Sequence, residues 1–289
     1  MTAVPRETPH GSRIPEDWPR EATLPAYGCT NCGFWQRYFD TPPSCPVCLD
    51  PRHVLPANGW EFLSPEDIDR RCRWDEVEPG IWRYTTEPAL GISSSGYVLV
   101  RDGGNVAFEA APFYDGAALD HIASIGGISY LSASHPHSYG ALWQLAERFE
   151  PEVLLQQDDL IWAKAFGVTW TYDDRAELDD GLTLINTGGH FAGHAVLYYE
   201  GRGILFAGDA VKLELADERT ANGISTHKAF VRRIPLTPDE VAKYRKVFGA
   251  LEFDQTFTPF EQCRNVGRET ILKLLDAQHP RPFVEAMPL

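Results

Sequence analysis

Residues 128–140 read ISYLSASHPHSYG, and most of the fold prediction depends on this stretch. It begins with an apolar run, Ile128 to Ala133, that is typical of a buried strand. The run is followed by His135 and His137, which are separated by one residue. Two imidazoles placed this way at the end of one strand can reach the same ion. The stretch therefore predicts part of a metal site.

Two further strand ends carry side chains that can bind a metal. Residues 187–194 read TGGHFAGH and follow an apolar strand, and residues 204–209 read ILFAGD. His190 and Asp209 each lie beside a glycine, which lets the backbone approach a crowded centre. Three imidazoles and a carboxylate suit zinc, or iron with an open coordination position. The sequence therefore predicts one metal centre built from several strand ends.

From residue 96 onward, apolar strands alternate with helices. The turn signal Arg101-Asp102-Gly103-Gly104 predicts a hairpin over residues 96–110. Helices are expected at residues 116–125, 141–149, 158–166 and 267–277, and another begins at Thr237.

The order H-x-H, then G-H-x-x-G-H, then an apolar strand ending in G-D resembles the metallo-β-lactamase superfamily and its glyoxalase-like members. The resemblance covers roughly residues 90–270. It implies an α+β fold, a four-layered αβ/βα sandwich with the metal site on loops at one edge of two sheets. It further implies that His135, His137 and His190 bind the first metal. Asp209 matches a carboxylate that bridges two metals in glyoxalase-like relatives, and His194 matches a supporting residue.

The sequence departs from the family pattern at the second metal. The usual string is H-x-H-x-D-H, whereas Tyr139 and Gly140 stand in the last two positions. The late turn, Thr258 to Glu261, also lacks the family's final histidine. The joint loss of these donors predicts a single-metal site.

Tyr139 either donates a hydrogen bond to an oxyanion or fills space, and His194 either transfers protons or is structural. The candidate catalytic residues are Asp209, Tyr139 and His194.

Four of the six cysteines form two C-x-x-C pairs, Cys29 with Cys32 and Cys45 with Cys48. Four thiolates brought together by two such turns complete the tetrahedral shell of zinc. A closed shell leaves no open position, so the expected role is structural. Iron bound as in a rubredoxin, or free thiols, are the alternatives that the spacing leaves open.

The predicted organisation has four parts. Residues 1–26 are expected to be an irregular arm, residues 27–52 the zinc ribbon, residues 53–80 a connector with one short helix, and residues 81–289 the sandwich domain. The net charge of −15 argues against general nucleic-acid binding. No apolar run approaches the roughly 18 residues of a membrane span, and no signal peptide is recognisable, so we expect a cytoplasmic protein.

The leading functional hypothesis is a metal-dependent hydrolase. A mononuclear metal-bound hydroxide would attack a small ester, thioester, lactone or amide substrate. One alternative is a mononuclear iron enzyme that resembles the persulfide dioxygenases. Another is a non-enzymatic metal-binding scaffold with the ribbon as a docking module. A homodimer is compatible with the sequence.

Overall fold

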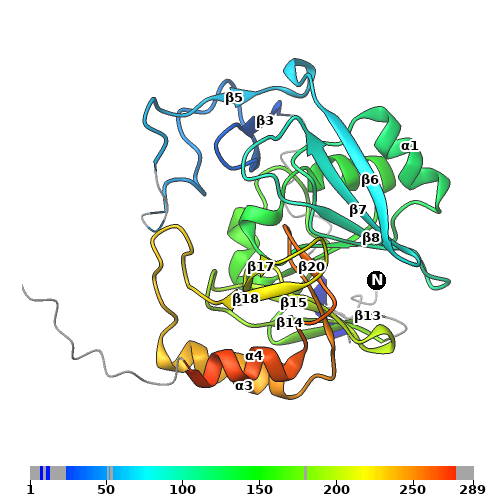
Figure 1. Ribbon diagram of the computed structural model, residues 1–289. Helices are drawn as coiled ribbons and strands as arrows, with labels where there is room; N and C mark the ends of the chain where they lie inside the picture. The colour runs from blue at the N-terminus through cyan, green and yellow to red at the C-terminus, as the bar shows by residue number, and fades with distance from the viewer. Residues whose placement is uncertain are drawn as a thin grey trace, which may run out of the picture.

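The computed structural model describes residues 7–8, 11–13, 24–50, 52, 55–178 and 181–277. Within these residues two large sheets pack face to face, and helices cover both outer faces (Figure 1). The predicted α+β sandwich of four layers is confirmed. No helix of the described chain is long and apolar enough to cross a membrane.

The larger sheet carries the first two predicted ligands at the end of one of its central strands. Neighbouring strands β9 to β12 run parallel, whereas β6 to β9 pair antiparallel. Helices α1 (Gly116–Ser124) and α2 (Leu142–Phe149) alternate with these parallel strands and belong to the buried cluster on the outer face. The strand order is β1 (Glu7–Thr8), β2 (Gly11–Arg13), β12 (Trp170–Tyr172), β11 (Glu152–Gln156), β10 (Tyr130–Ser132), β9 (Val106–Phe108), β8 (Gly96–Leu99), β7 (Ile81–Glu87) and β6 (Arg71–Glu78).

The smaller sheet carries the other two predicted ligands. Helices α3 (Pro238–Gly249) and α4 (Arg268–Ala277) share a buried cluster with its outer face. The strand order is β13 (Arg175–Leu178), β14 (Leu182–Asn186), β15 (Ala195–Tyr199), β16 (Ile204–Phe206), β19 (Gln255–Phe257) and β20 (Gln262–Cys263).

Aromatic side chains fill the space between the two sheets. Tyr97 of the larger sheet meets Phe206 of the smaller one, with ring centroids 5.2 Å apart. Phe206 in turn lies 5.3 Å from Phe257. These rings are buried, so they contribute strongly to the stability of the sandwich.

The start of α3 shows how the local sequence sets an element. Thr237 accepts a hydrogen bond from the backbone of Glu240, and the Glu240 carboxylate accepts one from the backbone of Thr237 at 2.8 Å. Pro238 follows at the first helical position. This reciprocal capping confirms the predicted helix start.

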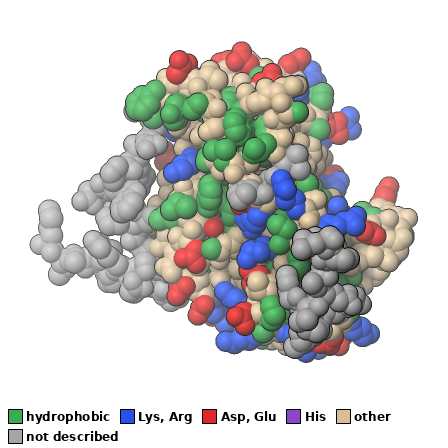
Figure 2. Space-filling view, turned by 90° about the vertical axis from the view of Figure 1, so that its left-hand side faces the viewer, with side chains coloured by type: hydrophobic (Ala, Val, Ile, Leu, Met, Phe, Trp, Pro, Cys, Tyr) green, Lys and Arg blue, Asp and Glu red, His purple; other side chains and the backbone are tan. Residues whose placement is uncertain are grey.

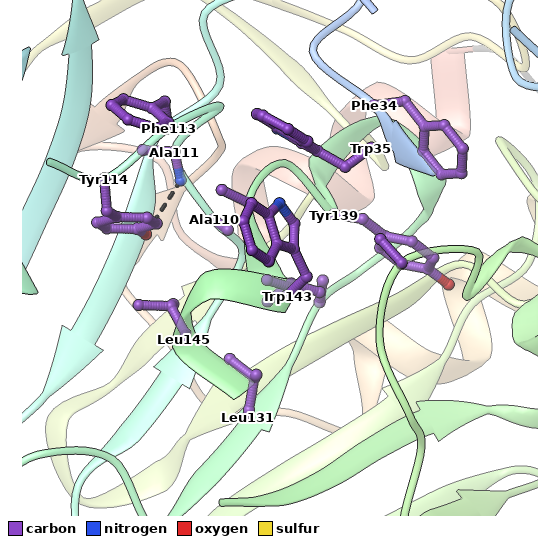
Figure 3. Packing of buried hydrophobic residues seen from close by; sticks show 14 of the residues in the cluster. Phe34, Trp35, Ala110, Ala111, Phe113, Tyr114, Leu131, Tyr139, Trp143 and Leu145 are labelled. Atoms are coloured by element: carbon purple, nitrogen blue, oxygen red, sulfur yellow. Dashed lines mark hydrogen bonds between the residues drawn. The ribbon is translucent and has the colours of Figure 1, made fainter. Parts of the chain in front are cut away.

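The cysteine-rich segment and one strand of the predicted connector, β5, form a small sheet that shares its core with the sandwich. Its strands are β3 (Ala26–Cys29), β4 (Trp35–Arg37) and β5 (Phe62–Leu63). Trp35 is buried, and its ring centroid lies 5.2 Å from that of Trp143 on α2. The Trp35 indole donates a hydrogen bond of 2.7 Å to the carbonyl of Pro112. Figure 3 shows Phe34 and Trp35 beside Tyr139 and Trp143 in this cluster.

Several sequence predictions differ from the structure. Part of the connector expected at residues 53–80 is strand β6, which pairs with β7. Its short helix is present as a 3-10 turn, η1 (Pro65–Asp67). The helix expected at residues 158–166 is a 3-10 helix, η3 (Gln157–Trp162). A hairpin of β17 (Lys212–Leu215) and β18 (Ala221–Ser225) was not anticipated.

The N-terminal arm was expected to be irregular. Strands β1 and β2 fall inside it, and β2 pairs antiparallel with β12, so this part of the prediction is wrong. Residues 1–6, 9–10 and 14–23 of the arm lie outside the described residues, as do 278–289 of the predicted sandwich domain.

A backbone crossing at Gly91 fixes the position of the ribbon. A Cβ at Gly91 would lie 2.1 Å from the backbone nitrogen of Gly33 and 2.3 Å from the carbonyl carbon of Cys32. Gly91 also has a φ of +60°. The backbones of the ribbon and of the loop before β8 therefore lie in direct contact.

We predict that Gly91→Ala separates the ribbon from the sandwich and lowers the free energy of unfolding. Gly59→Ala is the matched control, because Gly59 also has positive φ but a Cβ there meets nothing within 4 Å. The control should show only the left-handed backbone strain of about 1–2 kcal/mol. Gly91→Ala should cost at least about 2 kcal/mol more in urea unfolding. Equal losses in the two variants would contradict the crossing.

Candidate metal centre

The four predicted ligands come together where the two sheets meet. His135 and His137 lie just beyond β10 of the larger sheet, with His137 in the turn η2 (Pro136–Ser138). His190 lies between β14 and β15, and Asp209 lies beyond β16 of the smaller sheet. The site therefore depends on both sheets.

The spacing of the ligand atoms fits one ion. His135 Nε2 lies 3.4 Å from Asp209 Oδ2, and His190 Nε2 lies 3.7 Å from the same oxygen. His137 Nδ1 and His190 Nε2 are 3.1 Å apart, and all four ligand atoms lie within 4.8 Å of one another. Tetrahedral bonds of about 2.0–2.1 Å place ligand atoms about 3.4 Å apart. The types of ligand atom and the distances between them therefore suit a divalent transition metal.

Burial favours the form of histidine that binds metals. The side chains of His135, His137 and His190 are all buried. Burial, together with the neighbouring His135, lowers the pKa of His190 well below its ordinary value. Neutral imidazole is the form of histidine that binds metals, and a lowered pKa keeps His190 in this form at neutral pH.

His194 holds the backbone of Asp209. The Asp209 backbone N–H donates a hydrogen bond of 3.1 Å to His194 Nε2. Because a backbone N–H can only donate, the proton of a neutral His194 lies on Nδ1, which is 2.7 Å from the hydroxyl of Thr187. Burial and His135 lower the pKa of His194, which favours this neutral form. The placement agrees with the supporting role that the resemblance implied.

Gly208 allows the strand ends to approach each other. Its φ is +53°, and a Cβ would lie 2.4 Å from the hydroxyl of Ser134 and 2.8 Å from His194 Nε2. Ser134 precedes His135, and its hydroxyl lies 2.7 Å from His135 Nδ1. A side chain at position 208 would therefore displace groups that orient two ligands.

The structure gives no room for a side chain at Gly140, the position of the last histidine in the family's H-x-H-x-D-H string. A Cβ at Gly140 would lie 2.5 Å from the carbonyl oxygen of Ala110 and 2.6 Å from that of Ala111. Tyr139 is buried in the hydrophobic cluster with Phe34, Trp35 and Trp143 (Figure 3). It packs against Phe166 and donates a hydrogen bond of 3.4 Å to the carbonyl of Asp159. This placement in the core favours the interpretation that Tyr139 fills space.

Glu109 and Arg52 support the centre and were missed as site residues. The Glu109 carboxylate accepts a hydrogen bond of 3.0 Å from the backbone of Ser134, and burial raises the pKa of Glu109 to about 8. An acidic residue directly after an apolar strand is the signal that could have found it. The Arg52 guanidinium donates to the carbonyl of His190 and lies 5.0 Å from the ring of Phe191. No motif marks Arg52 in the sequence.

The four ribbon cysteines form a second candidate site. Cys29 Sγ and Cys48 Sγ are 3.9 Å apart, and Cys32 Sγ and Cys45 Sγ are 3.7 Å apart. Bonds of about 2.3 Å from four thiolates to zinc give sulfur separations of about 3.8 Å. The sulfurs are too far apart for disulfides, which need about 2.05 Å. Asn31 donates a hydrogen bond of 3.2 Å to Cys48 Sγ. The geometry fits the predicted Cys₄ metal site.

One cavity of about 540 Å³ lies against both candidate sites. Its lining combines ligands of the histidine site, two ribbon cysteines and several apolar side chains. The lining residues are Asn31, Cys32, Cys48, Ile92, His137, His190, Asp209, Val211, Lys212, Phe230, Val231, Phe260 and Glu261. Tyr139 and His194 are not among the described residues that line it.

Known proteins are similar to this chain in sequence and in fold. The family model for the metallo-beta-lactamase superfamily matches residues 119–238, a range that contains all four ligands of the histidine site. The uncharacterized protein YmaE of Bacillus subtilis (strain 168) is 27% identical over 250 residues, which cover 83% of this chain and 90% of that protein.

Two crystal structures have the same fold at low sequence identity. A metallo-beta-lactamase from Hirschia baltica is 17% identical, with a TM-score of 0.50 over 72% of this chain and 97% of that chain. The flavodiiron protein from Giardia intestinalis is 14% identical, with a TM-score of 0.51 over 71% of this chain and 58% of that chain.

We predict that Thr187→Val lowers the metal affinity of the histidine site by about 10–100-fold, because the Nδ1–H of His194 loses its acceptor and the ring that holds the Asp209 backbone is no longer oriented. Thr256→Val is the matched control: Thr256 is also buried and donates a hydrogen bond of 2.7 Å, but to the carbonyl of Val266. Metal titration with a competing chelator measures both. Similar affinity losses in the two variants would argue against the Thr187–His194–Asp209 chain.

Proposed function

We propose that this member of the metallo-β-lactamase superfamily is a metal-dependent hydrolase with a single ion in its histidine site. The bond that it cleaves is that of a small carbonyl substrate: an ester, thioester, lactone or amide. The ribbon carries a second, structural ion.

The observation that carries this proposal is the position of the ligands against the cavity. His137, His190 and Asp209 line it, so a substrate in the cavity can reach the ion that they would hold. Zinc in a catalytic site can expand to five-coordinate, so an ion held by all three histidines and Asp209 would still have a position for water or substrate from the cavity. A shell of four thiolates is the closed arrangement of structural zinc sites.

Crowding at the vacated second site supports the single ion. Gly140 cannot be replaced by a ligand without displacing the backbone at Ala110 and Ala111. Tyr139 points into the core instead of toward the cavity. Glu261 in the late turn lines the cavity, but the described residues form only one group of the His and Asp type.

The chain's own residues supply positioning. When bound, a divalent ion lowers the pKa of water toward 7 and polarises a carbonyl. His135, His137 and His190 would hold it as neutral imidazoles, and Asp209 would add the one negative charge. His194 keeps the Asp209 backbone in place, and Arg52 fixes the backbone at His190. Phe191 stands between Arg52 and the histidines, with its ring 5.1 Å from that of His137.

We expect purified protein to hold two metal ions per chain, and His190→Ala to hold one. The same change should lower hydrolysis of p-nitrophenyl esters at least about a hundredfold, since the ion supplies several kcal/mol. His121→Ala is the control, because His121 lies on α1, where its ring stacks on Trp74. This variant should change neither the metal content per chain nor the rate of ester hydrolysis.

The outcomes separate the alternatives. Iron instead of zinc in the histidine site would favour the mononuclear iron enzyme. Full metal content without hydrolysis of esters, thioesters, lactones or amides would favour a metal-binding scaffold. Three ions per chain would overturn the single-ion proposal and point to Glu261 as a further ligand.

A further inference from the structure

We propose that the ribbon forms one wall of the substrate pocket and that the pocket selects carbonyl substrates carrying an uncharged, apolar group of medium size. This inference rests on the proposed hydrolase function, whose substrate class it narrows.

The first support is the position of the ribbon. Asn31, Cys32 and Cys48 line the same cavity as the histidine site. The ribbon is held there by the backbone crossing at Gly91 and by the hydrogen bond from Trp35 to Pro112. A loop held by a metal ion and by buried contacts presents a rigid surface. A rigid surface gives a pocket a fixed shape for binding.

The second support is the apolar character of the remaining lining. Val211 is buried, whereas Ile92, Val231 and Phe260 are 38%, 67% and 41% exposed. When an apolar ligand covers large apolar side chains that are exposed around a cavity, their surface is removed from water, and this stabilises the complex. Figure 2 views the molecule from the side of the ribbon, and hydrophobic side chains gather on the upper part of this face.

The third support is the balance of charge. Beyond the metal ligands, the cavity is lined by one cation, Lys212, and one anion, Glu261. These two charges offset each other, so the lining outside the two metal centres has no excess of either charge. A cavity of about 540 Å³ can enclose an acyl group of several carbons together with the reacting carbonyl.

The test uses the metal-loaded protein and two probe series of increasing chain length. Acetohydroxamate to octanohydroxamate report binding, because their two oxygens bind zinc or iron. The corresponding p-nitrophenyl esters report hydrolysis. We expect the hydroxamate affinity to rise about threefold for each added methylene up to hexanohydroxamate. Constant affinity along the series would overturn the inference.

Asn31→Trp tests the ribbon wall. Asn31 is exposed, so the larger side chain should be accepted by the fold. We expect it to weaken hexanohydroxamate binding at least about tenfold more than acetohydroxamate binding. Thr41→Trp adds the same bulk to an exposed ribbon position outside the cavity lining and should have no such effect. Equal effects of the two variants would contradict the assignment.

Metal analysis accompanies both variants, because Asn31 also donates to Cys48 Sγ. Asn31→Gln keeps an amide for that sulfur and should change chain-length selectivity in the same direction, by at least about threefold. Hydroxamate binding with chain-length selectivity but no hydrolysis of esters, thioesters, lactones or amides would reject the hydrolase proposal and keep the pocket. Hydrolysis without chain-length selectivity would keep the hydrolase proposal and reject the apolar pocket.

Discussion

The close approach of the Gly208 backbone to Ser134 and His194 is the contact on which the metal centre depends. Ser134 follows a strand of the larger sheet, and Gly208 follows a strand of the smaller one. The contact brings His135 and Asp209 within 3.4 Å of each other. Since two independent sheets supply the ligands, the packing of the aromatic layer between them also determines the geometry of the site.

The ribbon contributes to the same site by a different route. Four thiolates would close the shell of an ion bound there and leave no position for a substrate, but the surface of the ribbon borders the cavity. Trp35 anchors it in the core beside Trp143, and Arg52 connects the adjoining segment to the backbone of His190. The small metal-binding unit is thus a structural part of the cavity and is not an independent appendage.

The sequence identifies the residues that the structure brings together at both candidate metal sites because their signals are local. His135, His190 and Asp209 each follow an apolar strand, and the C-x-x-C spacing needs no knowledge of the fold. The rest depends on distant contacts. Strand β6, RCRWDEVE, is mostly charged and becomes a strand through pairing with β7. The direction of Tyr139, the position of the ribbon and the role of Arg52 arise only from tertiary packing.

Anomalous diffraction from crystals of the metal-loaded protein locates each ion and therefore shows whether the histidine site holds a single metal. We expect two peaks per chain, one among the four ribbon sulfurs and one among His135, His137, His190 and Asp209. A third peak between Asp209 and Glu261, or no peak among the histidines, would contradict it.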